Sequence, residues 1–258
     1  MTHKTVGFIG GGRITRIFLT GWKHQGQVPL HVTVSDIHGE TLTKLKARFP
    51  GIETASGNGV AAARDIVFLA VHPPLMAEAV AGIKDSLKPG ALVVSLAPQL
   101  GFAKLAELLG GFSRLARVIP NAPSVVNSGF NPVAFAPGLM AADKTEITGL
   151  LSPLGECPEV SETKLDAYAL LTARGPAFFW FQFHELRESA RAAGLTDAEA
   201  QTGLERMVAG ALRTMAGSGL SADEMKDLIP VRPLANIEEQ ITEVYRAGFA
   251  GVPRKVKP

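Results

Sequence analysis

The chain has little of what marks secreted, membrane-embedded or nucleic-acid-binding proteins. Its 258 residues include a single cysteine, Cys157, which cannot form an internal disulfide bond. No run approaches the roughly 20 consecutive apolar residues that span a bilayer, and no secretory signal pattern precedes the first apolar segment. A formal net charge of +2 at pH 7 is too small to indicate a nucleic-acid partner. These absences predict a cytoplasmic protein whose partners include neither membrane nor nucleic acid.

Sequence support for metal or nucleophilic chemistry is also missing. The six histidines show no paired ligand spacing, and Cys157 has no histidine near it in the sequence. The histidines are His3, His24, His31, His38, His72 and His184. We therefore predict no metal site.

What the chain does have is a regular alternation of short apolar runs and amphipathic stretches up to about residue 160. The composition, with 46% hydrophobic and 19% charged residues, is typical of a globular protein with a sizeable core. The alternation is typical of a parallel sheet covered by helices on both faces. Strands are expected at residues 5–9, 31–35, 65–71, 91–96, 115–119 and 132–136, and helices at 40–48, 75–84 and 102–109.

After about residue 164 the pattern is helical to the end. Helices are expected at 175–193, 196–218 and 234–247, and Thr196-Asp-Ala-Glu199 resembles a capping box. An aromatic row from Phe178 to Phe183 is expected in a core or a dimer interface. The fold class is therefore α/β: a Rossmann-type parallel sheet domain at 1–160, then an all-helical dimerisation domain at 161–258.

The first strand runs directly into a glycine-rich turn, Thr-Val-Gly-Phe-Ile-Gly-Gly-Gly-Arg-Ile-Thr. Gly10 and Gly12 allow a tight turn and let a pyrophosphate approach the main chain, where the first amides of a helix face it. The third position of this motif, usually Gly or Ala, is Thr15. We predict a dinucleotide site at the two glycines, with Arg13 and Ile14 beside it; a solvated Arg13 is the alternative.

The second expected strand ends at Asp36, at about the distance from the glycines at which an acid binds the adenosine ribose. A carboxylate there favours NAD(H), because it would repel the 2′-phosphate of NADP(H). Ser35, His38 and Lys44 could offset that repulsion. A plain strand-helix-strand unit without nucleotide is the alternative.

Three more segments follow expected elements and carry polar or proline-rich sequences. They read Leu69-Ala-Val-His-Pro73, Arg117-Val-Ile-Pro-Asn-Ala-Pro123 and Thr172-Ala-Arg-Gly-Pro-Ala177. In an open parallel sheet the ligand lies outside the carboxyl ends of the strands. We therefore expect Ala70, Val71, His72, Pro73 and Asn121 to face the cofactor. The alternatives are an ordinary loop residue at His72 and an Asx-turn at Asn121.

Together these segments resemble the pyrroline-5-carboxylate reductase family over nearly the whole chain. The family carries Ala-Val-Lys-Pro, Arg-x-Met-Pro-Asn-x-Pro, Ser-Gly-Ser-Gly-Pro-Ala and Lys-Asp-x-Val-x-Ser-Pro-Gly-Gly-Thr-Thr after its glycine turn. The residues kept here are Gly10, Gly12, Ala70, Val71, Pro73, Arg117, Pro120, Asn121, Pro123, Gly175, Pro176, Ala177, Lys226 and Asp227. The most specific match is the segment from Arg117 to Pro123.

The resemblance implies hydride transfer from NADP(H), with NAD(H) possible, to the C=N carbon of a cyclic imine in a homo-oligomer. The implied substrate is 1-pyrroline-5-carboxylate and the product is proline. Such a reaction needs close positioning in a dry pocket more than acid–base catalysis. The alternatives are a reductase of another imine or carbonyl compound, and a nucleotide-binding protein without catalysis.

Two departures from the family lie where the substrate is expected. The serines of the third segment are Thr172 and Arg174, and the late Pro-Gly-Gly-Thr-Thr loop is Pro230-Val-Arg-Pro-Leu. In the family that loop offers amides and hydroxyls to the substrate carboxylate, whereas proline has no N–H to donate.

We expect Arg174 and Arg232, with Gly175 and Pro176 alongside, to bind the carboxylate instead through forked hydrogen bonds. Exposed arginines without a role are the alternative. Asn121 is expected to orient the nicotinamide or the substrate, and Thr172 is the candidate general acid other than water.

Overall fold

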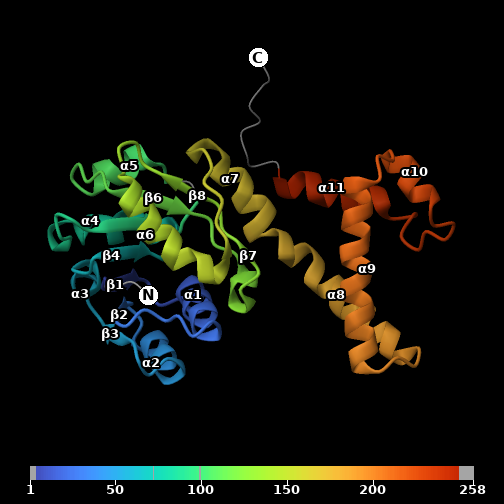
Figure 1. The fold of residues 1–258 in the computed structure, drawn as a ribbon, viewed down its shortest axis with the longest axis horizontal. Coiled ribbons are helices and arrows are strands. Elements are labelled where there is room, and N and C mark those ends of the chain that lie inside the picture. Colours follow the sequence, from blue (N-terminus) through green and yellow to red (C-terminus); the bar gives the residue numbers. More distant parts are fainter. Residues whose placement is uncertain (1–3, 72, 99, 250–258) are drawn as a thin grey trace, which may run out of the picture. The chain divides into compact units, whose positions relative to one another are not determined.

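The computed structural model describes residues 4–71, 73–98 and 100–249. The chain divides into two compact units, Met1–Arg174 and Gly175–Pro258. The first is built on a sheet and the second is helical (Figure 1).

A seven-stranded sheet organises the first unit, in the order β3-β2-β1-β4-β5-β6-β8. Every pairing from β3 to β6 is parallel, and β8 runs antiparallel to β6. The strands are β1 (Val6–Ile9), β2 (Val32–Ser35), β3 (Glu53–Ala55), β4 (Ile66–Leu69), β5 (Leu92–Ser95), β6 (Leu115–Val118) and β8 (Val133–Phe135). Two short strands, β7 (Gly129–Phe130) and β9 (Gly155–Glu156), form a separate parallel pair.

Helices cover both faces of this sheet, which explains why its strands are apolar along their whole length. Successive residues of β4 alternate between two cores: Ile66 and Phe68 pack on one face, Val67 and Leu69 on the other. The first face is covered by α1 (Arg13–His24), α2 (Gly39–Arg48) and α6 (Ala141–Leu151). The other face is covered by α3 (Asn58–Ala62), α4 (Pro73–Ala81) and α5 (Phe102–Leu108).

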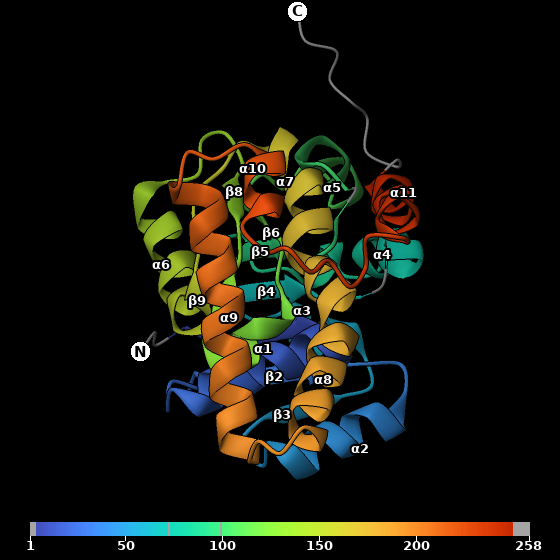
Figure 2. The ribbon, with the colours of Figure 1, turned by 90° about the vertical axis from the view of Figure 1, so that its right-hand side faces the viewer.

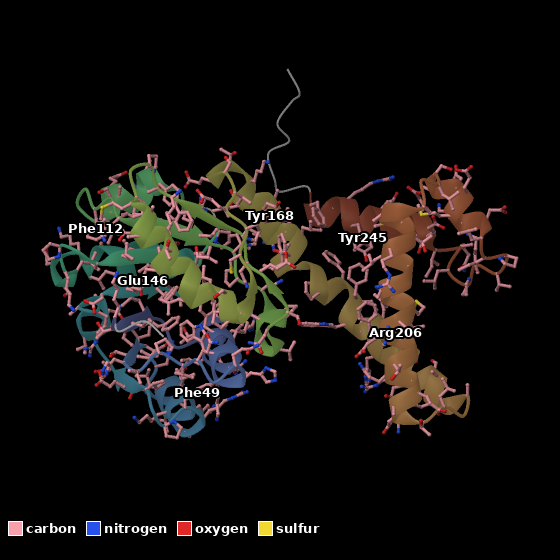
Figure 3. All side chains as sticks on the ribbon, viewed as in Figure 1. Phe49, Phe112, Glu146, Tyr168, Arg206 and Tyr245 are labelled. Atoms are coloured by element: carbon pink, nitrogen blue, oxygen red, sulfur yellow. The ribbon has the colours of Figure 1, made fainter. Side chains whose placement is uncertain are left out.

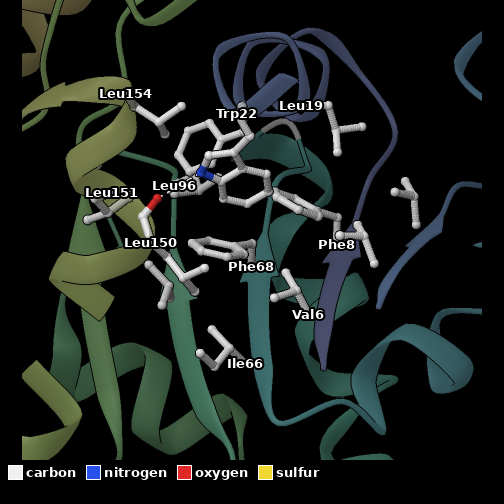
Figure 4. Packing of buried hydrophobic residues seen from close by; sticks show 14 of the residues in the cluster. Val6, Phe8, Leu19, Trp22, Ile66, Phe68, Leu96, Leu150, Leu151 and Leu154 are labelled. Carbon is white, nitrogen blue, oxygen red and sulfur yellow. Dashed lines mark hydrogen bonds between the residues drawn. The ribbon is translucent and has the colours of Figure 1, made fainter. Parts of the chain in front are cut away.

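Aromatic side chains fill the first of these cores. The rings of Phe8 and Phe68 stack with centroids 4.8 Å apart, and Trp22 meets Phe8 edge-on at 5.8 Å. The buried indole N–H of Trp22 donates to the carbonyl of Leu150 at 2.8 Å, which joins α1 to α6 (Figure 4). A buried donor is therefore satisfied, and the helices on this face are fixed to each other.

The predicted strands and helices are confirmed to within a few residues at their ends, whereas the short β7, β9, α3 and the helix at Ala222–Asp227 were not predicted. Three further differences have clear physical reasons. The β8 strand is antiparallel, so the sheet is mostly rather than entirely parallel. The edge strand β3 was missed because its residues are exposed or half-buried and form no apolar run. Helix α6 was also missed, because its apolar residues are interrupted by charged and polar ones.

Residues 161–174 continue the first unit rather than the second. They form a 3-10 turn (Glu162–Lys164), α7 (Leu165–Tyr168) and one turn of π-helix (Ala169–Ala173). Leu165 and Ala169 are buried against Ile119 and Ala134 of the sheet layer. The compact units thus meet fourteen residues beyond the predicted end of the first domain, at 174 instead of 160, and the functional domain boundary stays a prediction.

The second unit consists of α8 (Gly175–Ala192), α9 (Asp197–Gly217), α10 (Ala222–Asp227) and α11 (Glu238–Phe249). Helices α8 and α9 lie side by side (Figure 2), and the predicted capping box of Thr196 and Glu199 is confirmed. Tyr245 of α11 packs on the ring of Phe178 at 4.9 Å (Figure 3).

The helical unit leaves much of its apolar surface uncovered. Trp180 is 54% and Phe181 69% exposed in the single chain, and among its described residues only Ala200 is buried. A helical surface of this kind needs a second surface to pack on. In the described part of the chain no helix has the length and hydropathy to cross a membrane.

Candidate functional site

The glycine turn joins β1 to α1, and its glycines are needed for different reasons. Gly10 has φ of +104°, and a Cβ there would lie 2.8 Å from the carbonyl oxygen of Ala70. The fold itself therefore requires glycine at this position. At Gly12 φ is −73° and nothing lies within 4 Å of a Cβ. The chain leaves open space at Gly12, as a turn that receives a pyrophosphate must.

Thr15 stands at the third position of the motif and takes part in the turn. Its side chain is fully buried, and its hydroxyl donates to the carbonyl of Gly10 at 2.5 Å. Threonine in place of Gly or Ala thus adds a hydrogen bond that stabilises the turn, and it does not obstruct access to the turn. Of the other predicted residues here, Arg13 is exposed and Ile14 is half-buried.

The turn lies where the order of the strands reverses. Strands β1 and β4 are neighbours, with β2 and β3 beyond β1 and β5 and β6 beyond β4. The amide of Ala70 donates to Ile9 at 2.8 Å, which places Gly10 and Ala70 side by side at the carboxyl ends. In sheets of this kind ligands bind in the crevice at this switch point.

The segment that follows β4 contains four of the residues predicted to face the cofactor. Ala70 and Val71 are half-buried there, Pro73 is the first residue of α4, and His72 lies outside the described residues. Ala70 and Val71 therefore border the turn on the side opposite β2.

Asp36 lies on the other side of the turn, immediately after β2. One carboxylate oxygen accepts the amide N–H of Gly11 at 2.8 Å, and the other accepts that of His38 at 2.8 Å. These bonds fix the carboxylate between the glycine turn and the start of α2. Ser35, in contrast, is fully buried, and its hydroxyl contacts Asn58 at 2.9 Å and Phe8 at 3.3 Å.

Asn121 follows β6 and is buried in a polar network. Its side-chain oxygen accepts the amide of Phe130 at 3.2 Å, and its side-chain nitrogen donates to the carbonyl of Thr172 at 3.4 Å. Its own amide donates to the buried side chain of Asn131 at 3.1 Å. Both ends of the Asn121 amide are thus occupied by the chain itself. This arrangement favours a positioning role, and direct contact with cofactor or substrate stays a prediction.

The same network brings together the two predicted catalytic residues. Thr172 belongs to the π-helical turn, a distortion often found at functional sites, and its hydroxyl donates to the carbonyl of Tyr168 at 2.9 Å. The ring of Tyr168 packs on Phe130 with centroids 6.0 Å apart (Figure 3). Thr172 is held close to Asn121 in this way, and its role as a proton donor stays a prediction.

An ion pair between a buried arginine and a half-buried glutamate anchors this segment to the sheet. The guanidinium of Arg117, 4% exposed, lies 2.9 Å from the carboxylate of Glu162. The same carboxylate oxygen accepts the first amide of α5, that of Phe102, at 2.6 Å. Sequence patterns did not single out Glu162; the available signal was that an arginine at the end of a buried strand needs an acid.

The predicted carboxylate-binding arginines lie in different compact units. Arg174 is exposed at the end of the π-helical turn, and Gly175 and Pro176, half-buried, open α8. Arg232 lies 2.5 Å from the carboxylate of Glu238, whose other oxygen is 2.5 Å from Lys226. Hydrogen bonds from Lys226 and Arg232 lower the pKa of Glu238. Two cations thus share one anion in this loop.

Cys157 is half-buried, and burial raises the pKa of its thiol to about 12. A thiol in that state is a poor nucleophile. Over residues 4–71, 73–98 and 100–249 there is no group of three or more His, Cys, Asp or Glu side chains able to hold a metal ion.

Family models match both parts of the chain. Residues 5–99 match the model described as NADP oxidoreductase coenzyme F420-dependent, and residues 162–231 match that described as pyrroline-5-carboxylate reductase dimerisation. A pyrroline-5-carboxylate reductase of Escherichia coli is 28% identical over 249 residues, covering 96% of this chain and 92% of the relative. One of Methanosarcina acetivorans is 26% identical over 251 residues, with the same coverage of 96% and 92%.

Solved structures give the same result. A pyrroline-5-carboxylate reductase from Coxiella burnetii is 26% identical, with a TM-score of 0.70 and coverage of 96% of both chains. The Plasmodium falciparum enzyme, solved with NADP bound, has a TM-score of 0.75 at 19% identity and covers 96% of both chains, which shows the shared fold.

A glycine turn at the switch point of a parallel sheet, followed by a helical dimerisation unit, defines a nicotinamide-dependent oxidoreductase. Within that class, the likeness over nearly the full length is to pyrroline-5-carboxylate reductases, and residues 162–231 match the dimerisation model of that family.

Proposed function

We propose that this protein reduces 1-pyrroline-5-carboxylate to proline with NAD(P)H as hydride donor. The observation that carries this proposal is the likeness to pyrroline-5-carboxylate reductases over 96% of the chain. The open space at Gly12 and the fixed acid at Asp36 fit a bound dinucleotide. Gly10, Gly12 and the first amides of α1 would hold its pyrophosphate.

The reaction adds a hydride to the C=N carbon and a proton to the ring nitrogen, so that the C=N double bond becomes a C–N single bond and one C–H and one N–H bond form. The nicotinamide supplies the hydride when it is bound, and water or Thr172 supplies the proton. Because an iminium carbon is already electrophilic, the protein contributes mainly by holding the ring close and excluding water. The network of Asn121 and the ion pair of Arg117 with Glu162 hold the segment that carries Thr172.

Arg232 and Arg174 are proposed to bind the substrate carboxylate. The loop has lost the glycines and threonines of its family, and Pro233 removes one amide donor. Lys226 and Arg232 both pair with one acid, Glu238, so a substrate carboxylate could serve as a second anionic partner for the two cations. A guanidinium fork suits a carboxylate well.

The enzymatic test is the consumption of NAD(P)H by the purified protein with pyrroline-5-carboxylate. Stoichiometric formation of proline is expected. Turnover only with other cyclic imines or carbonyl compounds would favour the second candidate, which the altered loop after Pro230 supports. Cofactor binding without any turnover would exclude both.

The test of the arginine is Arg232→Ala, with Arg246→Ala as its matched control. Arg246 is an exposed arginine that pairs with Glu239 at 3.0 Å, so its loss should leave the kinetics unchanged. Loss of Arg232 should raise KM for the carboxylated imine at least about tenfold with little change in kcat, because the ground state and the transition state carry the same carboxylate. An unchanged KM would remove Arg232 from the site.

The match to the dimerisation model supports a homo-oligomer. Its size, dimer or larger, is part of the proposal, as are a cytoplasmic location and the absence of nucleic-acid partners, which rest on composition.

A further inference from the structure

The choice between NADH and NADPH is made where the adenosine ribose lies, and the residues there are well defined. Asp36 is half-buried at the carboxyl end of β2 and next to the glycine turn. Each of its oxygens accepts one backbone N–H, from Gly11 and His38, both at 2.8 Å. A carboxylate oxygen has two lone pairs, so each oxygen keeps one acceptor position for a ligand hydroxyl.

The side chains that could have favoured a 2′-phosphate are engaged elsewhere. The hydroxyl of Ser35 is buried and turned to Asn58 and Phe8. On α2 the ammonium of Lys44 is 2.6 Å from Glu40, and that of Lys46 is 2.5 Å from the carbonyl of Ile52.

Exposed basic side chains near the turn include His38 and Arg13. His38 is exposed as the N-cap of α2, but its amide is taken by Asp36. Arg13 is the first residue of α1, where the pyrophosphate is expected. Neither side chain is fixed against Asp36. The charge that the structure holds in place where the adenosine ribose is expected is therefore the negative charge of the Asp36 carboxylate.

We propose that this protein binds NADH in preference to NADPH, and that Asp36 is the residue that sets the preference. The inference rests on the proposed function, since it concerns the cofactor of that site. The Asp36 carboxylate accepts hydrogen bonds from the ribose hydroxyls of NADH. A 2′-phosphate, with a charge of about −1.5 to −2 at pH 7, meets a fixed negative charge instead.

The test is a binding measurement without substrate. The full-length protein is titrated with NADH and with NADPH by calorimetry, at low and at physiological ionic strength. We expect Kd for NADPH to exceed Kd for NADH by at least about thirtyfold at low salt, and by less at high salt, because salt screens partly exposed charges. Equal affinities, or tighter NADPH, would overturn the inference.

Two variants assign the effect to its residue. Asp36→Ser keeps a hydrogen-bond acceptor for the turn and removes the charge, and it should bring the two Kd values within about threefold of each other. Glu40→Gln removes a nearby exposed acid that is paired with Lys44, and it should keep the preference of the unmodified protein. An Asp36→Ser protein with the original preference would contradict the assignment.

A measurement on the unmodified protein covers the case in which Asp36→Ser does not fold. Displacement of bound NADH by adenosine 5′-monophosphate should need a much lower concentration than displacement by adenosine 2′,5′-bisphosphate. Equal displacement would overturn the inference. Proline formation with either dinucleotide is measured separately, so non-selective binding refutes the preference while turnover still supports the proposed function.

Discussion

Replacing each of two glycines in the turn after β1 by alanine should harm different properties of the protein. At Gly10 the methyl group of Gly10→Ala would lie 2.8 Å from the carbonyl oxygen of Ala70, in a residue with φ of +104°. At Gly12 the methyl group of Gly12→Ala would enter space in which the chain has no atom within 4 Å. The first change strains the fold, and the second fills space that we propose a bound pyrophosphate occupies.

The magnitudes follow from these two environments. A non-glycine residue held in a sparsely populated backbone conformation costs about 1–3 kcal/mol, and relieving a contact with rigid backbone costs about 1–3 kcal/mol more. Gly10→Ala should therefore lower the free energy of unfolding by about 2–6 kcal/mol, or Tm by about 4–24 °C. Gly12→Ala should cost about 1 kcal/mol or less, as for an N-cap change from glycine to alanine.

Cofactor affinity should show the opposite contrast. Gly12→Ala should weaken dinucleotide binding at least about tenfold, equivalent to roughly 1.4 kcal/mol, while remaining folded at 25 °C. Thermal unfolding by circular dichroism and calorimetric titration with NADH measure the two effects. Unweakened binding by Gly12→Ala would show that the pyrophosphate does not lie at this turn, and equal stability of the two variants would refute the argument from strain.

Two further predictions concern single ionisable groups. Burial raises the pKa of the Cys157 thiol to about 12, so very little thiolate is present at pH 8. The thiol should therefore react with a disulfide reagent on the order of a thousand times more slowly in the native protein than after denaturation. A rate equal to that of the denatured protein would show that Cys157 is not buried. The hydrogen bond from Lys88, with those from Thr5, lowers the pKa of Asp65 to about 2, so Asp65→Asn should destabilise the protein at pH 7 by about 1 kcal/mol, a value reduced for solvent screening. Since the folded pKa is depressed, the stability difference between Asp65→Asn and the unmodified protein should be complete above about pH 4 and vanish as pH falls towards 2 in denaturant titrations; a difference that persists at pH 2 would contradict it.

Most of the sheet was predictable because its strands are buried on both faces and are apolar throughout. What periodicity could not give was the edge strand at Glu53–Ala55, whose residues are exposed or half-buried, and the antiparallel direction of β8, which depends on the connection and not on composition. Helix α6 was not predicted for a related reason, because charged residues such as Asp143 and Lys144 interrupt its apolar pattern. Asp143 is nevertheless buried, and Arg114 pairs with it at 2.8 Å.

The site was predictable where a local motif describes it. The glycine turn and Asp36 lie within one strand-helix-strand unit, so sequence spacing brings them together. The partners of Asn121 include Phe130, Asn131 and Thr172, and the last of these is separated from it by 51 residues. No local pattern encodes such a contact, which arises only when the segment after β9 packs back on the sheet.

The bare surface of the helical unit has a consequence for how the protein is made. Since Ala200 is the lone buried residue among those described between 175 and 249, these helices gain little by folding before their apolar faces are covered. The sheet unit is completed first as the chain leaves the ribosome, and because it has its own hydrophobic core it can fold before the helical unit does. Acquisition of ordered helices should then depend on subunit concentration, so newly synthesised chains at low abundance would be exposed to proteolysis in this segment and protected as their number rises.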